Sequence, residues 1–200
     1  MKRILFFLFI LFSINTSYSQ LGTTHYIPPI PKGDTGSDVV DVQHIYLTTP
    51  IEGTISAYIK PVGGTRTDWI PVSFSNNNPL DWPIPNNQFT VNDNLAGKVS
   101  NKGYIIESSN DFYANERFNS SNPAQQGSFV SKRKSTPGTE FRVAVAPNGD
   151  TTSTNIGFTA INFISIMATE DNTLVEIDGI NFSNSSIINT PPTGPIALNK

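Results

Sequence analysis

The chain has 200 residues, 14% charged side chains, a formal charge of −3 and no cysteine. An acidic chain lacks the basic surface that grips a phosphate backbone, so the composition argues against nucleic-acid binding. The absence of cysteine excludes disulfides, thiolate zinc sites, iron–sulfur clusters and cysteine nucleophiles. Fourteen glycines and 15 prolines indicate a chain that turns often and rarely sustains a helix, and we expect an all-β fold.

Residues 1–19 have the pattern of a secretory signal peptide. Lys2 and Arg3 form a basic start, residues 4–12 are apolar, and a small-x-small site at 17–19 precedes Gln20. This apolar run is too short for a transmembrane helix, which needs about 20 residues. We therefore predict cleavage between Ser19 and Gln20, export to the extracellular space or outer cell surface, and no transmembrane segment.

After Gln20, short β-branched and aromatic runs alternate with turn residues, and no helical periodicity is sustained. The predicted strands cover 44–49, 54–60, 70–74, 103–107, 112–117, 129–132, 140–146, 161–169 and 173–178. The polar residues 169–173 predict a tight hairpin turn. The Asn- and Pro-rich segment 76–94 predicts a long surface excursion.

Short internal matches indicate a repeated unit of roughly 115 residues, although chance similarity between hairpins is an alternative explanation. The matched pairs are 21–27 with 137–143, 44–47 with 163–166, and 101–102 with 199–200. We expect a first β unit over 20–136, with an insertion near 76–94, and a second over 137–200 that is cut off at its C-terminus. Many short strands favour an antiparallel β-sandwich, and a β-propeller repeat fragment is the alternative.

Segments 103–114, 136–143 and 163–177 resemble the N-terminal domain of the IgGFc-binding protein family. The form they are most similar to occurs in large secreted Bacteroidetes proteins that end in a gliding-motility-associated, type IX secretion sorting domain. The sequence MATEDNT at 167–173 is the most specific part of this resemblance. The resemblance implies a cell-surface adhesin within a longer multidomain chain, and it supplies no ligand-binding residue.

The two histidines, His25 and His44, have no other histidine or carboxylate at a metal-ligand spacing, and we interpret both as structural strand residues. The chain contains no GxSxG, HExxH or phosphate-binding glycine loop. These patterns predict no catalytic residue and no cofactor.

Two carboxylate pairs flank predicted turns, Glu107 with Asp111 and Glu170 with Asp171. A pair of carboxylates about 5 to 9 Å apart is the machinery of glycoside hydrolysis. Turn formation explains both pairs more simply, because Asp and its neighbours bond back to their own backbone.

The calcium candidates are Asp34, Asp38 and Asp41, which lie within eight positions. Their spacing lacks the alternating oxygen ligands and the glycine of an EF-hand loop, and a solvated linker is the alternative.

The partner-contact candidates are Trp82, Lys132, Arg133 and Lys134. Trp82 lies among prolines and asparagines, whereas Trp69, near a strand, is predicted to be structural. The basic run suits an anionic glycan or lipid headgroup, and protection of a sheet edge is the alternative.

The sequence as a whole predicts a non-catalytic extracellular recognition or adhesion module, with an extracellular protein or a glycan as its partner. A secreted carbohydrate-active enzyme or carbohydrate-binding accessory module is the alternative, and a plain spacer domain is a third.

Overall fold

The computed structural model describes residues 20–31, 40, 42–91, 99–119, 126–131, 138–141, 164–177 and 196–198. Outside these residues lie the predicted signal peptide, the calcium candidates Asp34, Asp38 and Asp41, and the basic run Lys132, Arg133 and Lys134.

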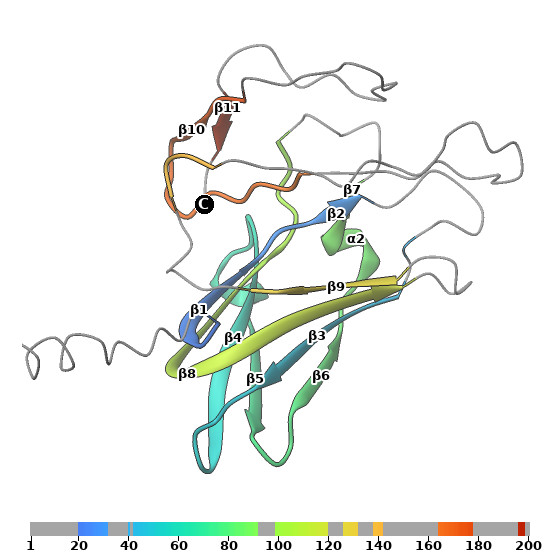
Figure 1. The fold of residues 1–200 in the computed structure, drawn as a ribbon, viewed down its shortest axis with the longest axis vertical. Helices are drawn as coiled ribbons and strands as arrows, with labels where there is room; N and C mark the ends of the chain where they lie inside the picture. Colours follow the sequence, from blue (N-terminus) through green and yellow to red (C-terminus); the bar gives the residue numbers. More distant parts are fainter. Residues whose placement is uncertain are drawn as a thin grey trace, which may run out of the picture.

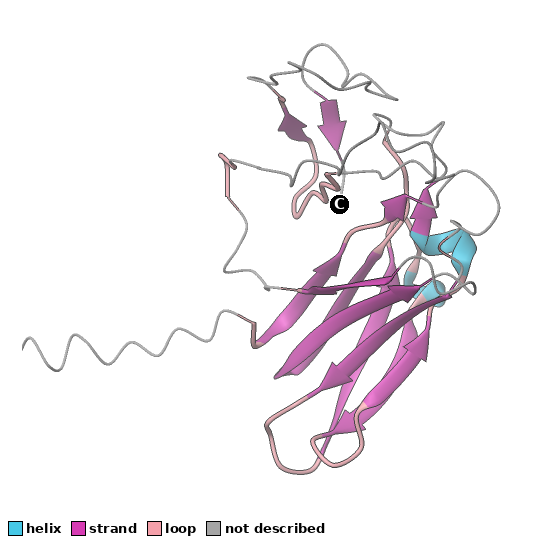
Figure 2. Ribbon diagram, turned by 45° about the vertical axis from the view of Figure 1, so that its right-hand side comes forward, coloured by secondary structure: helices cyan, strands magenta, loops and turns pink. Residues whose placement is uncertain are grey.

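Seven strands form one antiparallel sheet that folds into a two-layered, sandwich-like body (Figures 1 and 2). These strands are β1 (Gly22–Ile27), β3 (Val42–Thr48), β4 (Thr54–Pro61), β5 (Ile70–Ser75), β6 (Leu80–Pro83), β8 (Tyr104–Asn119) and β9 (Gln126–Val130). The all-β class predicted from the sequence is confirmed, and the strands follow the sandwich-like prediction and not the propeller alternative.

The other described elements are short. The parallel pair is β2 (Ile30–Pro31) with β7 (Thr90–Val91), and the antiparallel pair is β10 (Thr173–Val175) with β11 (Ile196–Leu198). Helical structure among the described residues amounts to α2 (Asn86–Phe89) and a 3-10 turn, Arg66–Asp68.

Strand β8 belongs to both layers. Its first part pairs with β1 and β4, and its second part pairs with β3 and β9. We call β1, β4, β5 and the first part of β8 layer one, and β3, β6, β9 and the second part of β8 layer two. Figure 1 shows β8 as the long strand that runs across the body.

The change of layer occurs at a polar segment of β8. Pairing with β4 ends at Ser108, pairing with β3 begins at Tyr113, and the Ser108 hydroxyl donates to the Ser56 carbonyl at 2.7 Å. The prediction of two strands separated by a turn at Glu107–Asp111 is therefore wrong. Serine, asparagine and aspartate favour turns, but here they accompany a change of pairing partners within one continuous strand.

The core lies between the two layers because alternate side chains of each strand face inward. In β4 every second residue is buried, and β3 shows the same alternation. The Trp82 ring of layer two meets the Tyr104 ring of layer one edge-on, with 5.2 Å between centroids. The largest apolar side chains of this core are Phe74, Phe89, Phe112, Tyr104, Ile45, Leu47, Ile59 and Ile106.

Residues 76–91, the described part of segment 76–94, are not the surface excursion that their composition predicts. They supply β6, which pairs with β3, and they bury Ile84 and Phe89. The neighbouring prolines are tolerated because β6 pairs with a single strand among the described residues, so a missing N–H on its other side breaks no ladder.

The loop that precedes β8 depends on one glycine. Gly103 has φ +101°, and a Cβ at this position would lie 2.7 Å from the carbonyl oxygen of Ile27. Its own N–H donates to the Gln88 carbonyl at 3.1 Å, and its carbonyl accepts from the Val62 N–H at 3.1 Å. Gly103 thereby links the start of β8 to the segments that contain Val62 and Gln88. Only glycine adopts this backbone conformation without strain.

The described C-terminal residues differ from the predicted hairpin. The turn at 169–172 is present, with Asn172 at φ 58° and the Thr173 hydroxyl donating to the Glu170 carbonyl at 2.8 Å. Residues 164–168, however, form no strand, and β10 pairs with β11 instead. Residues 140–141, expected to begin a strand, are not in one. The division into two repeated units stays a prediction.

Candidate functional site: an aromatic and basic patch on layer one

The outer face of layer one carries a group of aromatic and charged side chains. We call it the Trp69 patch, and it consists of Tyr58, Lys60, Arg66, Trp69 and Glu107. The alternation of β4 directs Tyr58 and Lys60 away from the core, and Tyr58 is 41% exposed. Glu107 lies opposite Tyr58 on β8.

The loop between β4 and β5 brings Arg66 and Trp69 to this face. The loop is held by its own hydrogen bonds, from the Gly64 N–H to the Pro61 carbonyl at 3.0 Å and from the Asp68 N–H to the Thr65 carbonyl at 2.9 Å. Asp68 Oδ2 accepts from both the N–H and the hydroxyl of Thr65, each at 2.7 Å. These two bonds lower the pKa of Asp68, because they favour its ionised form.

The patch is a stack of cations on aromatic rings. The Arg66 guanidinium carbon lies 4.2 Å from the centroid of Trp69 and 5.1 Å from that of Tyr58. Lys60 Nζ lies 3.7 Å from the Trp69 centroid, and the two rings are 6.0 Å apart at 57°. Cation–π contacts of this kind orient the side chains that make them.

The two cations differ in their ionic partners. Lys60 forms an ion pair with Glu107. Arg66 forms no ion pair within the part of the chain that the structure describes, and the nearby Asp68 is bonded to Thr65 instead. The guanidinium of Arg66 therefore contacts two aromatic rings and lacks a carboxylate partner among these residues.

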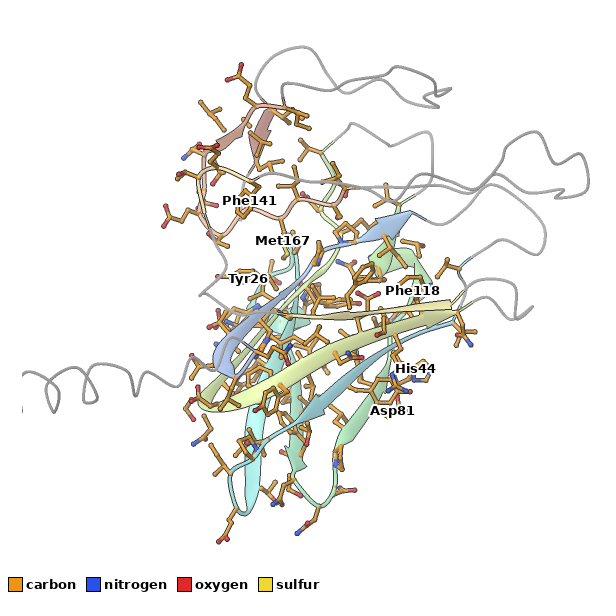
Figure 3. The ribbon with its side chains drawn as sticks, in the orientation of Figure 1. Tyr26, His44, Asp81, Phe118, Phe141 and Met167 are labelled. Atoms are coloured by element: carbon orange, nitrogen blue, oxygen red, sulfur yellow. The ribbon has the colours of Figure 1, made fainter. Side chains whose placement is uncertain are left out.

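A second polar group lies on the outer face of layer two. We call it the His44 cluster, and it consists of His44, Tyr46, Asp81 and Arg117. His44 Nδ1–H donates to Asp81 Oδ1 at 2.5 Å, and Figure 3 shows the two side chains together on β3 and β6. The Arg117 guanidinium carbon lies 5.1 Å from the Tyr46 centroid. Burial and the neighbouring Asp81 carboxylate raise the pKa of Tyr46.

The two histidines have different surroundings. His25 is fully buried, and its Nε2–H donates to the Phe112 carbonyl at 2.8 Å, as a structural role predicts. His44 is 30% exposed and bonded to a carboxylate. Sequence inspection missed this partner because Asp81 is 37 positions away and is brought alongside only by the pairing of β3 with β6.

Both tryptophans are half-buried, and the partner contact predicted for Trp82 stays a prediction. Trp82, the predicted contact residue, is half-buried and packs against the core. Trp69, predicted to be structural, belongs to the surface patch. The partner candidates Lys132, Arg133 and Lys134 lie outside the described residues.

Of the carboxylates considered for catalysis, Glu107 forms an ion pair with Lys60. Asp111 lies in β8, where its backbone carbonyl accepts a hydrogen bond from the Thr49 hydroxyl at 2.8 Å. Glu170 and Asp171 lie in the turn before β10. Among the described residues there is no group of three or more histidine, aspartate or glutamate side chains placed to hold a metal ion.

Comparisons of the chain with protein-family models, curated proteins and solved structures give no match. The resemblance to the IgGFc-binding family therefore stays a prediction. In the described part of the chain, no helix has the length and apolar character needed to cross a bilayer.

Proposed function

We propose that the chain is a non-catalytic extracellular recognition or adhesion module that contacts a protein partner through the Trp69 patch. The observation that carries this proposal is the assembly of the exposed Tyr58 and Arg66 with the half-buried Trp69 on a sheet face. Tryptophan, tyrosine and arginine are the residue types that most often dominate the binding energy of protein interfaces.

The rigidity of the patch supports the same function. Tyr58 projects from a strand with partners on both sides, and Arg66 projects from a loop that is closed by hydrogen bonds. Side chains already fixed in one arrangement lose less conformational entropy when a partner binds.

A protein partner fits this face better than stacking of a bare sugar ring. Both Lys60 and Arg66 lie over the Trp69 ring, which leaves less of its π face available to a sugar. The signal-peptide pattern of residues 1–19 and the family resemblance support export and a place in a longer cell-surface chain, and both are part of the proposal.

Binding of the labelled, purified chain to an array of extracellular proteins and to an array of glycans tests this function. We expect saturable binding to protein spots, with at least about tenfold weaker binding for Trp69→Ala, because loss of an interface anchor costs about 2 kcal/mol or more. His44→Ala, on the opposite layer, is the matched control and should bind as the unchanged chain does.

Two outcomes would contradict the proposal. One is saturable binding that Trp69→Ala leaves intact, and the other is the absence of saturable binding on the protein array. Hydrolysis of an arrayed polysaccharide that Glu107→Gln abolishes would favour the carbohydrate-active alternative instead.

A further inference from the structure

The edges of the sheet differ in how well they are protected against pairing with a further strand. Strands β1, β5, β6 and β9 each pair with a single other strand among the residues that the structure describes. Proline occurs in β5 and in β6, and the register of β1 is interrupted between Gly22 and Thr24. Prolines, charges and irregular pairing are the usual protection of a sheet edge.

Strand β9 has none of these features. Residues 126–131 include no proline and no charged side chain, and the pairing of β9 with β8 is regular along the whole strand. Ser128, Phe129 and Val130 are all exposed, Phe129 by 47%. Since successive side chains point to opposite faces, both faces of β9 are exposed. An uncharged, exposed edge of this kind favours pairing with another strand.

The backbone of β9 presents hydrogen-bonding groups on its open side. The Ser131 N–H donates to the Ala114 carbonyl at 3.0 Å, so these residues form a hydrogen-bonded pair of the antiparallel ladder. Such pairs recur at every second residue, which makes Phe129 a member of the next one. The N–H and C=O groups of Ser128 and Val130 therefore point away from β8.

A row of aromatic rings extends from the core to this edge. Phe118 packs against the hydrophobic core, and its ring stacks on that of Phe129 with 5.4 Å between centroids. Gly127 leaves room for the Phe118 ring, because a Cβ at Gly127 would lie 2.3 Å from it. Phe129 is the outermost ring of the row, and nearly half of its surface is exposed. The edge therefore has apolar surface left to bury.

We infer that two copies of the chain pair through β9, antiparallel and about a two-fold axis at Phe129. In this register, Phe129 lies opposite Phe129 of the second copy, and Ser128 lies opposite Val130. The outward N–H and C=O groups of Ser128 and Val130 then bond to each other across the axis. The two Phe129 residues form a pair of the non-hydrogen-bonded type, in which opposing side chains approach most closely.

A second copy fits this edge because the strand is complementary to itself. A two-fold contact uses the same surface on both copies, so each contact is made twice. Identical strands do not repel each other here, since β9 carries no charge. The antiparallel arrangement also separates the two basic runs, each of which follows Ser131 in the sequence. A five-residue strand buries less than the roughly 1,200 Å² of a standard interface, so we expect a weak dimer.

Sedimentation equilibrium of the purified chain between about 1 and 500 μM tests the pairing. We expect a monomer–dimer equilibrium that Ser128→Pro weakens at least about tenfold, because proline lacks the outward N–H. That N–H takes no part in the pairing with β8, so melting curves should show that the variant is folded. Ser128→Ala keeps the N–H and is the matched control, which should dimerise as the unchanged chain does.

The absence of cysteine from the chain allows a second test, which examines the register. Phe129→Cys places two thiols opposite each other at the axis, with a Cα separation of about 4.5 Å that a disulfide can span. We expect mild oxidation to give a covalent dimer. Ser73→Cys, which is exposed on the edge strand β5, is the control and should stay monomeric.

Each result supports or overturns the inference. A chain that stays monomeric up to about 500 μM overturns it, as does a dimer that Ser128→Pro leaves intact. Equal cross-linking through Phe129→Cys and Ser73→Cys also overturns it. If the chain is monomeric but Ser128→Pro abolishes binding on the protein array, β9 accepts a strand of another protein and the second-copy inference is wrong. The function of the Trp69 patch is tested separately, by the binding of Trp69→Ala.

Discussion

Layer one buries apolar side chains of β4 and β5 in the core, whereas layer two buries Gln43 and Glu116 among its apolar residues. The buried polar ring in layer one, His25, donates a hydrogen bond to Phe112. In layer two, Gln43 Oε1 and Glu116 Oε1 have no hydrogen-bond partner among the described residues. A buried polar atom without a partner reduces stability, so layer two is the more vulnerable half of the sandwich.

The outer faces of the two layers differ in the partner of their local carboxylate. Each places an arginine over a tyrosine, but on layer one the local carboxylate is paired with a lysine, and on layer two it is bonded to a histidine. The two arginine–tyrosine contacts therefore lie beside different charged pairs, Lys60 with Glu107 on layer one and His44 with Asp81 on layer two. Recognition is proposed for the outer face of layer one, where the arginine also lies beside a tryptophan, and pH sensitivity is assigned to the interior of layer two.

The largest expected effect is a pH dependence of stability that originates in layer two. Glu116 is 1% exposed, and burial raises its pKa to about 8. Its proton is held more tightly in the folded than in the unfolded chain. The stabilisation is complete below the unfolded pKa near 4.5 and is lost as the pH rises through about 8.

Chemical denaturation at pH 5 and at pH 8 measures this effect. The free energy of unfolding should fall by at most about 1.4 kcal/mol per pH unit in this window, a total of several kcal/mol. Glu116→Gln has nearly the same shape and cannot ionise, so its stability should vary less with pH. Equal slopes for the two chains would show that Glu116 does not titrate in this range.

The next effect sharpens the contrast with layer one. Ile59 is fully buried in β4, and Ile59→Ala should destabilise the chain by about 3 kcal/mol, because it removes buried methyl groups and leaves a cavity. This loss should be the same at pH 5 and pH 8, since no titratable group is removed. The same denaturation series checks it, and a pH-dependent loss would mean that the two layers are coupled through the core.

The smallest effect concerns the outer faces. Lys60→Met removes one ion pair and one cation–π contact from the Trp69 patch, and we expect a loss of about 1 kcal/mol. Asp81→Asn on layer two should cost less than about 1 kcal/mol, because its pair with His44 is more exposed. Thermal melting of both variants tests the order, and a larger loss for Asp81→Asn would reverse it.

The strands that alternate cleanly were predictable from the sequence. The predictions at 44–49, 54–60 and 70–74 correspond to β3, β4 and β5, because β-branched and aromatic residues recur there with a period of two. Strand β6 was missed because its prolines read as a loop signal. That signal fails at a strand that pairs on one side only.

The candidate site could not be predicted in the same way. Tyr58 and Lys60 are readable as outward residues of a strand, but nothing in the sequence brings Arg66 and Trp69 back over them. That placement depends on a closed loop between β4 and β5. The pairing of Lys60 with Glu107 likewise spans 47 positions and arises from the register of β4 with β8.

The shared strand β8 has a consequence for the order in which the protein assembles. Four strands pair with it, and the bond from His25 to Phe112 spans 87 positions. Strands β1, β3 and β4 therefore cannot complete their pairing until β8 has been synthesised. Pairing between residues so far apart in the sequence is slow to form. For a chain exported as proposed, this delay keeps the polypeptide unfolded, and so able to pass through a secretion channel, until most of the domain has been made.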